Sequence, residues 1–510
     1  MHAPVRPPAE APVVLDGTSL RIADVVRVAR GGVPARLAPA AEARLREVRA
    51  IVDGIVARHE VVYGITTGFG KLSDVAIPPG RLAELQVNLV RSHAAGVGPL
   101  LSAPEVRAIT LLRANVLARG HSGIRAEVVQ RLLALLALGM HAPIPEQGSV
   151  GASGDLAPLS HLALALIGEG MLLDGAGVAR PAADVWAEHG FAPLVLRPKE
   201  GLALVNGTQA HTALAALALH DARVLWQAAH VTGAASLDAL LGTPVAFDAR
   251  IHAVRGQPGQ ERSAAVLRRL LEGSALRESH RLGDPRVQDA YALRCMPQVH
   301  GPVLEALDFA EGLVARELNA ATDNPLVFED GTMLSGGNFH GQAVAMACDV
   351  LAIALTNLAT MAERRIDRLV HPDLNQGLPP FLTPDPGVCS GFMMAQVTAA
   401  ALASECKGLA HPASVDTIPT DGGKEDVVPM AMGAATKLRR VVHNTAHVIA
   451  IELMCAVQGI ECRRPLRSSP RIEEAVRRVR AIVPRLEADR VLTHDMETLA
   501  AAVLRGELVV

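Results

Sequence analysis

The stretch Gly148-Ser149-Val150-Gly151-Ala152-Ser153-Gly154-Asp155-Leu156 decides how the fold and chemistry of this chain are predicted. It places Ala152-Ser153-Gly154, three small residues, in a loop with two further glycines. Glycine adopts backbone angles that other residues avoid, and small side chains let a backbone fold tightly on itself. A backbone nitrogen can then attack a nearby backbone carbonyl. Loss of water at the serine would leave an electrophilic five-membered ring built from the chain itself.

Other glycine-rich loops differ from this one at Asp155. A phosphate-binding loop needs Lys and then Ser or Thr after its glycines, and an acid there would repel phosphate. The nucleophile elbow of serine hydrolases needs a glycine two residues after the serine, where this chain has Asp155. An ordinary glycine-rich turn fits these nine residues equally well. The rest of the chain must therefore decide between a turn and a reactive loop.

Composition indicates a soluble, cytoplasmic protein. The chain has 510 residues, enough to bury a large core, and its net charge of −3 argues against a nucleic-acid partner. No apolar run is long enough to predict a membrane span, so no membrane partner is expected. Residues 1–12 are rich in Pro and Ala and predict a loose tail rather than a signal peptide. The six cysteines form no CxxC pair and are expected to be buried, reduced thiols.

Apolar periodicity predicts a mainly α fold. Residues 341–369 are apolar on every side, which is typical of a helix buried in a large core. Strand patterns appear only near residues 13–15 and 61–63. Helices are expected at 82–95, 104–118, 126–138, 210–241, 341–369, 395–409 and 434–457.

These elements predict two regions with a boundary near residue 205. A mixed N-terminal region, 13–205, would carry the glycine-rich loop, and a bundle of long, buried helices would occupy 206–510. Helices this apolar exceed what one chain readily covers, so we expect a homo-oligomer.

Tyrosine occurs at only two positions, Tyr63 and Tyr291, and both lie in polar, loop-like segments. This placement favours a chemical role, although each tyrosine could instead anchor a loop through its hydroxyl. Removal of ammonia from an α-amino acid needs an electrophile for the amine, a base for the β-proton and a cation for the carboxylate. Ser153, Tyr63 and Arg294 can supply these parts. Because the ordinary pKa of tyrosine is near ~10, neighbouring groups would have to lower that of Tyr63.

Six segments, in the same order along the chain, resemble the aromatic amino acid ammonia-lyase family, whose electrophile is 4-methylidene-imidazol-5-one (MIO). The resemblance runs from about residue 13 to the C-terminal region. The segments are Tyr63-Gly64 through Phe69-Gly70, Ser92-His93-Ala94-Ala95-Gly96, Gly151 through Leu159, Lys199-Glu200-Gly201-Leu202-Ala203 with Asn206-Gly207-Thr208, Val287-Gln288-Asp289 through Arg294, and Gly337-Asn338-Phe339-His340-Gly341.

The resemblance implies a role for each matching residue. It implies that Ala152, Ser153 and Gly154 cyclise to MIO without an external cofactor, and that Tyr63 is the β-proton base. It also implies a helical homotetramer whose active sites draw residues from more than one subunit. The remaining implied roles are holding the electrophile and the substrate amine (Asn206 and Tyr291), binding the carboxylate (Arg294) and lining the pocket (Gln288 and Phe339). Taken alone, Asn206 fits a helix N-cap equally well.

Two residues resemble the histidine-specific branch of the family. His93 and Glu425 match positions that this branch uses near the imidazole, although a backbone-bonded histidine and a solvated glutamate are the plainer interpretations. The loop 421–430 departs from the family pattern, because Lys424 replaces a glutamine and Val427 a histidine. We therefore expect conversion of L-histidine to trans-urocanate, a step of histidine catabolism. A lyase or aminomutase for another aromatic amino acid is the alternative.

Two other classes of protein remain to be weighed. A relative that had lost its activity and served as a scaffold would be expected to lack the triad, the tyrosine or the arginine, and all are present. Nineteen histidines invite a metal site, but the chain has no HExxH motif or close His/Cys cluster. We expect no required metal.

Overall fold

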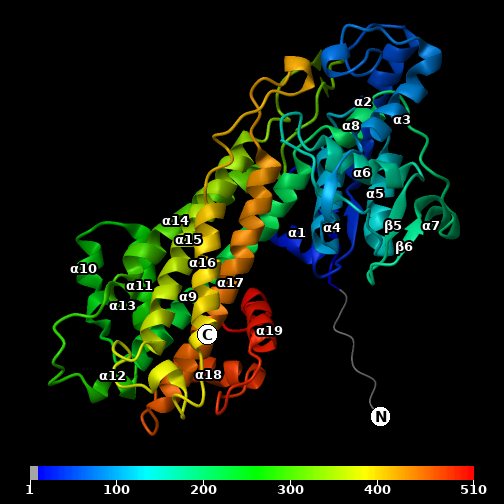
Figure 1. The fold of residues 1–510 in the computed structure, drawn as a ribbon. Helices are drawn as coiled ribbons and strands as arrows, with labels where there is room; N and C mark the ends of the chain where they lie inside the picture. The colour runs from blue at the N-terminus through cyan, green and yellow to red at the C-terminus, as the bar shows by residue number, and fades with distance from the viewer. Residues whose placement is uncertain (1–9) are drawn as a thin grey trace. The chain divides into compact units, whose positions relative to one another are not determined.

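The computed structural model describes residues 10–510 and is mainly α-helical, as predicted (Figure 1). Residues 1–9 of the predicted N-terminal tail lie outside the described part. The chain forms two compact units built from alternating stretches. The first comprises the chain up to Leu217 with Gly312–Cys348 and Pro412–Thr436, and the second comprises Ala218–Glu311, Asp349–His411 and Lys437–Val510. The boundary predicted near residue 205 concerns consecutive domains and stays a prediction.

The first unit packs helices around short strand pairs and the glycine-rich loop. Its helices and 3-10 turns are α1 (Ile22–Ala29), α2 (Pro39–Ala57), η1 (Gly70–Leu72), η2 (Pro79–Arg81), α3 (Leu82–His93), α4 (Ala103–Ala118), α5 (Ala126–Leu138), α6 (Leu156–Leu166), α7 (Ala182–Glu188), α8 (Glu200–Val205) and η5 (Asp421–Gly423). Its strands are β1 (Val13–Leu15), β2 (Ala35–Leu37), β3 (Val97–Leu100), β4 (Pro145–Gln147), β5 (Met171–Leu173), β6 (Ala179–Pro181), β7 (Leu326–Val327) and β8 (Met333–Leu334).

Local signals set the ends of these helices. At the start of α4, the Ser102 backbone N–H and hydroxyl both donate to Glu105 Oε2 at 2.7 Å, which caps the helix. Helix α5 ends at Gly139, whose φ of +68° is the left-handed conformation that terminates helices. Such caps explain why the predicted bounds of α5 match the structure.

The strands differ from the prediction. Val61–Tyr63 leads into a turn rather than a strand, because the Val62 N–H donates to the Thr66 hydroxyl at 2.9 Å and the Thr66 N–H returns to the Val62 carbonyl. Three antiparallel pairs, β3–β4, β5–β6 and β7–β8, also occur where none was predicted. Their strands have two to four residues, too few for an alternating pattern to be seen.

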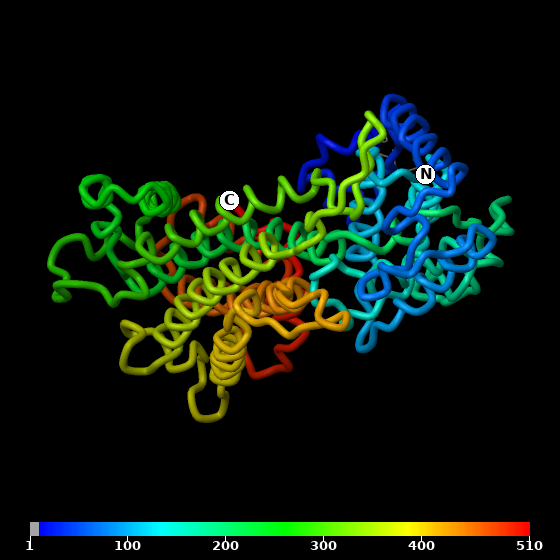
Figure 2. The backbone as a smooth tube through the Cα atoms, turned by 90° about the horizontal axis from the view of Figure 1, so that it is seen from above, coloured from blue at the N-terminus to red at the C-terminus, as the bar shows by residue number. Residues whose placement is uncertain are grey.

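The predicted long helices are present as α9 (Gln209–Ala239), α14 (Met296–Glu317), α15 (Gln342–Val370) and α17 (Ala431–Cys462). Within the second unit, segments of these helices run side by side (Figures 1 and 2). Arg365 on α15 donates to both carboxylate oxygens of Glu452 on α17, and Ser236 on α9 donates to the same carboxylate at 2.6 Å. Because all three side chains are buried, this charge network penalises any other register of the helices.

Shorter elements complete the second unit. They are η3 (Pro244–Phe247), α10 (Ala249–Ala253), α11 (Pro258–Leu271), α12 (Ala275–Ser279), α13 (Tyr291–Arg294), η4 (Pro380–Leu382), α16 (Met393–Leu409), α18 (Pro470–Ile482) and α19 (Thr493–Leu504). All six cysteines are free thiols.

Helices α15 and α17 correct the prediction that no apolar segment is long enough to cross a membrane. Both are long and apolar enough by length and composition alone. In their most apolar 18-residue windows, 67% and 83% of the residues are buried inside the protein. Buried core helices have the same composition. The absence of a membrane partner stays a prediction.

Candidate active site

The predicted reactive loop joins β4 to α6 and is fixed by its backbone. Gly151 and Gly154 have φ angles of +75° and +71°, in the left-handed region that glycine favours. The Gly151 carbonyl accepts from the Gly341 N–H at 3.0 Å. A Cβ atom at Gly154 would lie 2.6 Å from the Cα of Gly207, closer than side chains approach a backbone. Only glycine therefore fits the last position of the Ala152-Ser153-Gly154 triad.

A buried carboxylate anchors the end of the loop. Asp155 accepts hydrogen bonds from the Ser149 hydroxyl at 2.8 Å, the His211 N–H at 2.9 Å and His211 Nδ1 at 2.9 Å. Burial alone would raise the pKa of Asp155, but His211 and the Ser149 hydroxyl outweigh burial and lower it. Asp155 therefore stays ionised and ties the loop to α9.

Asn206 holds the central residue of the triad. Its side-chain nitrogen donates to the Ser153 carbonyl oxygen at 2.8 Å, while its buried Oδ1 has no hydrogen-bond partner in the described structure. Asn206 lies at the C-terminal end of α8, which replaces the N-cap interpretation. The buried Arg113 guanidinium donates to the Asn206 carbonyl at 3.0 Å and fixes the chain that carries this amide.

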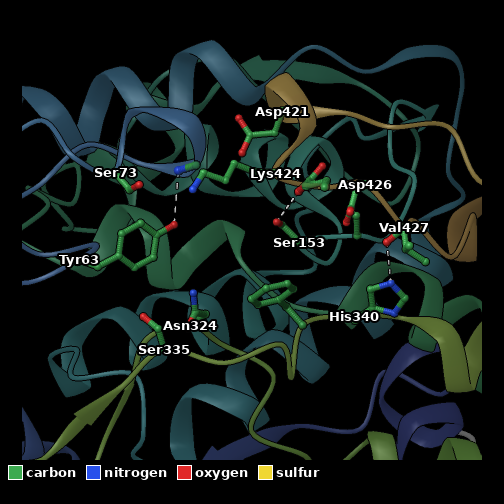
Figure 3. Close-up of a pocket in the computed structure, with 14 residues that line it drawn as sticks. Tyr63, Ser73, Ser153, Asn324, Ser335, His340, Asp421, Lys424, Asp426 and Val427 are labelled. Carbon is green, nitrogen blue, oxygen red and sulfur yellow. Dashed lines mark hydrogen bonds between the residues drawn. The ribbon is translucent and has the colours of Figure 1, made fainter.

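The triad opens into a pocket of about 450 Å³ in the first unit (Figure 3). Of the predicted site residues, the pocket wall brings together Tyr63, Ala152, Ser153, Phe339 and Glu425. The two loop residues that depart from the family pattern, Lys424 and Val427, line it as well. The rest of the wall is mostly polar and consists of Gly70, Ser73, Asn324, Ser335, His340, Asp421 and Asp426.

The Tyr63 hydroxyl points into this pocket and accepts a hydrogen bond from the Gly70 N–H at 3.4 Å (Figure 3). Burial raises the pKa of Tyr63. The Gly70 N–H lowers it, but the charges of Asp421, Asp323 and Glu425 add to the effect of burial. The net shift is upward, opposite to the lowering that a base requires. Positive charge beyond that of this pocket is needed to ionise Tyr63 near neutral pH.

Glu425 contacts the triad directly. The Ser153 hydroxyl donates to Glu425 Oε1, and the Thr420 hydroxyl donates to Glu425 Oε2. The Thr420 N–H also donates to the Glu425 carbonyl at 2.9 Å. The carboxylate is therefore held at the loop rather than solvated.

Several pocket residues were missed by sequence reasoning. Asp421 accepts from the Lys71 N–H at 3.3 Å, and His340 donates through Nε2 to the Val427 carbonyl at 3.0 Å. Both lie in segments whose neighbours were singled out, so the signal was present. Ser73, Asn324 and Ser335 carry no recognisable motif.

Four predicted substrate-binding residues are not among the residues that line the pocket. His93 ends α3 and donates through Nδ1 to the Leu89 carbonyl at 2.9 Å. Gln288, Tyr291 and Arg294 belong to the second unit. There the Arg294 guanidinium lies 4.5 Å from the centre of the Tyr291 ring, and Tyr291 is 70% exposed.

Within residues 10–510, no group of three His, Cys, Asp or Glu side chains is placed to hold a metal ion. The prediction that the protein requires no metal stays a prediction.

The whole chain resembles characterised lyases. A family model for aromatic amino acid lyase matches residues 20–481. A histidine ammonia-lyase of Anaeromyxobacter sp. (strain K) is 54% identical over 504 residues, covering 97% of this chain and 99% of that protein.

Solved structures agree with this similarity. A histidine ammonia-lyase from Trypanosoma cruzi matches with a TM-score of 0.90 at 44% identity, covering 98% of this chain and 94% of that chain. A tyrosine aminomutase from Streptomyces globisporus matches with a TM-score of 0.92 at 40% identity, covering 98% of each chain. The chain therefore belongs to the aromatic amino acid lyase family and is a carbon–nitrogen lyase.

Proposed function

We propose that this protein eliminates ammonia from L-histidine to give trans-urocanate, using an MIO ring formed from Ala152, Ser153 and Gly154. The observation that carries the proposal is the position of Ser153. Its carbonyl accepts from Asn206, its hydroxyl donates to Glu425, and Tyr63 lines the same pocket.

The residues around the triad fit such a ring. Cyclisation joins the Gly154 nitrogen to the Ala152 carbonyl carbon, and the left-handed Gly154 backbone, which has no room for a Cβ, suits so tight a turn. The amide of Asn206 would hold the carbonyl of the central residue, and its unpartnered Oδ1 offers an acceptor for the substrate amine. Once formed, the ring supplies an electrophile that makes the amino group a leaving group.

The chain's own groups account for proton transfer and substrate recognition. Tyr63 would take the β-proton, and Glu425 would accept a hydrogen bond from an imidazole N–H. The polar wall contributed by Asp421, Asn324 and His340 suits an imidazole better than a phenyl ring. His93 is proposed as a further contact to the imidazole.

We also propose a homotetramer in which a neighbouring copy supplies Gln288, Tyr291 and Arg294. This assembly is supported by the exposure of the segment that carries them, where Tyr291 is 70% and Val287 97% exposed. The Arg294 guanidinium has two parallel donors, which match the two oxygens of the substrate carboxylate. Free cysteines accord with a cytoplasmic location, and we propose no external cofactor or metal.

The first test is incubation of the purified protein with L-histidine while urocanate is followed by its ultraviolet absorbance. We expect absorbance to rise with the wild type and not with Ser153→Ala. The intact mass of the wild type should be two waters below the value calculated from the sequence. No rise in absorbance, together with an unmodified mass, would refute the proposal.

A second candidate is an aminomutase or a lyase for another aromatic amino acid. It is favoured by the similarity to a tyrosine aminomutase and by Lys424 and Val427, which depart from the usual loop and line the pocket. Assays with tyrosine and phenylalanine distinguish these activities. A β-amino acid product identifies a mutase, and an arylacrylate with free ammonia identifies a lyase.

A further inference from the structure

The Ser153–Glu425 contact has a role before catalysis as well as during it. In the chain before cyclisation, the Ser153 hydroxyl donates to Glu425 Oε1, although the two residues lie 272 positions apart. The same hydroxyl must leave as water when the ring is completed. Resting on the proposed function, we propose that Glu425 is the acid–base group that dehydrates Ser153, and so takes part in building the electrophile.

The chemistry of the step requires a group that carries one proton between two atoms. The carboxylate takes the Cα hydrogen of Ser153 as a proton, and the electrons of that bond become the Cα–Cβ double bond. The Cβ–Oγ bond breaks with its electron pair on oxygen. Glu425 then returns the proton to Oγ, which leaves as water with its own hydrogen. Glu425 ends as the carboxylate with which it began, so no oxidant or further reactant is needed.

The surroundings of Glu425 hold it for this task. Its other oxygen, Oε2, accepts from the Thr420 hydroxyl, and the Thr420–Glu425 backbone pair fixes the base of the side chain. Across the triad, the Asn206 amide donates to the Ser153 carbonyl at 2.8 Å. A donor on that oxygen stabilises the negative charge that builds up beside Cα when its proton leaves. Ser153 is thus held between a donor on its carbonyl and an acceptor on its hydroxyl.

Dehydration also changes what Glu425 can bind. While Ser153 keeps its hydroxyl, Oε1 is occupied by that donor. Loss of the hydroxyl frees Oε1 for a new donor in the same pocket. One carboxylate can therefore serve ring formation first and substrate binding afterwards, and the substrate-binding oxygen becomes available only when the electrophile exists.

The test follows ring formation by mass rather than by turnover. Wild type, Glu425→Gln and Asp426→Asn are expressed in the same way, and the fraction of chains lacking two waters is measured by intact mass over time after synthesis. Glutamine keeps the shape and an acceptor oxygen but cannot carry the proton. Asp426 is the matched control, because it lines the same pocket on the same loop and makes no hydrogen bond to Ser153 in the described structure.

We expect Glu425→Gln to slow the loss of two waters by about 10²- to 10⁴-fold, the usual contribution of an acid–base group. Asp426→Asn should form the ring at the wild-type rate. Hydrogen exchange across residues 148–156 verifies that the loop is folded in each variant, and Glu425→Asp should recover part of the rate. Wild-type ring formation in Glu425→Gln would overturn the inference and leave the proposed function standing. An unmodified wild type would instead refute the ring itself.

Discussion

Replacement of Gly154 by alanine tests the claim that backbone crowding fixes the reactive loop. Gly154 has a φ of +71°, and a Cβ there would overlap the backbone of Gly207. Gly139, at the end of α5, is a matched control with a φ of +68° and nothing within 4 Å of an added Cβ. The two substitutions share the conformational cost and differ in the contact.

The expected magnitudes follow from this difference. Alanine in the left-handed region costs about 1–2 kcal/mol at either site. At Gly154, overlap with a backbone that cannot move aside adds about 1–3 kcal/mol. The Asp155 N–H to Gly207 carbonyl bond at 2.8 Å is also lost, which adds about 0.5–1.5 kcal/mol. Gly154→Ala should therefore cost about 1.5–4.5 kcal/mol more than Gly139→Ala.

Hydrogen exchange by mass spectrometry measures the local free energy at each site. We expect faster exchange across residues 148–156 in Gly154→Ala, with loss of the two-water mass change. In Gly139→Ala, the end of α5 should be only slightly less protected and ring formation normal. Equal destabilisation in the two variants would show that crowding against Gly207 does not hold the loop.

The other predictions concern charge and assembly. Asp421→Asn removes a carboxylate whose charge raises the pKa of Tyr63. Because the base must be ionised, the rising limb of the profile of kcat/KM against pH should move to lower pH, and a move upward would contradict this role. Lys199 and Asp323 form a buried ion pair at 2.8 Å, so Lys199→Met should lower the free energy of unfolding in denaturant titration by about 3–5 kcal/mol. A further Asp323→Leu substitution should restore much of this loss. Tyr63→Phe and Arg294→Ala should each be nearly inactive, whereas subunits of the two variants refolded together should regain urocanate formation at sites that combine intact residues.

Sequence patterns predicted the helices better than the contacts between them. Helix α5 begins and ends as predicted because the left-handed Gly139 sets its end, and α9 follows its apolar pattern as one helix. The segment 61–63 was wrong because the hydroxyl of Thr66, a few residues later, captures its backbone. That competition depends on side-chain geometry, which a count of apolar residues does not record.

The same limit applies to the candidate site. Ser153 and Glu425 were predicted from separate motifs, but their hydrogen bond exists only in the fold. Asp155 appeared in the sequence only as an obstacle to phosphate, whereas the structure uses it to bind His211, 56 positions away. A buried carboxylate needs partners, yet the chain has 19 histidines, and no local pattern identifies which one it meets.

The charges around Tyr63 give a reason for sharing active sites between subunits. Asp421, Glu425 and Asp426 line the pocket against a single ammonium group, that of Lys424. This wall attracts the amino group of an amino acid, disfavours its carboxylate and raises the pKa of Tyr63. A guanidinium such as that of Arg294, brought by a neighbouring copy, would bind the carboxylate and favour the ionised tyrosine. We therefore expect an isolated subunit to fold and to form its ring, yet to be a poor catalyst, because its base stays protonated until assembly supplies the missing positive charge.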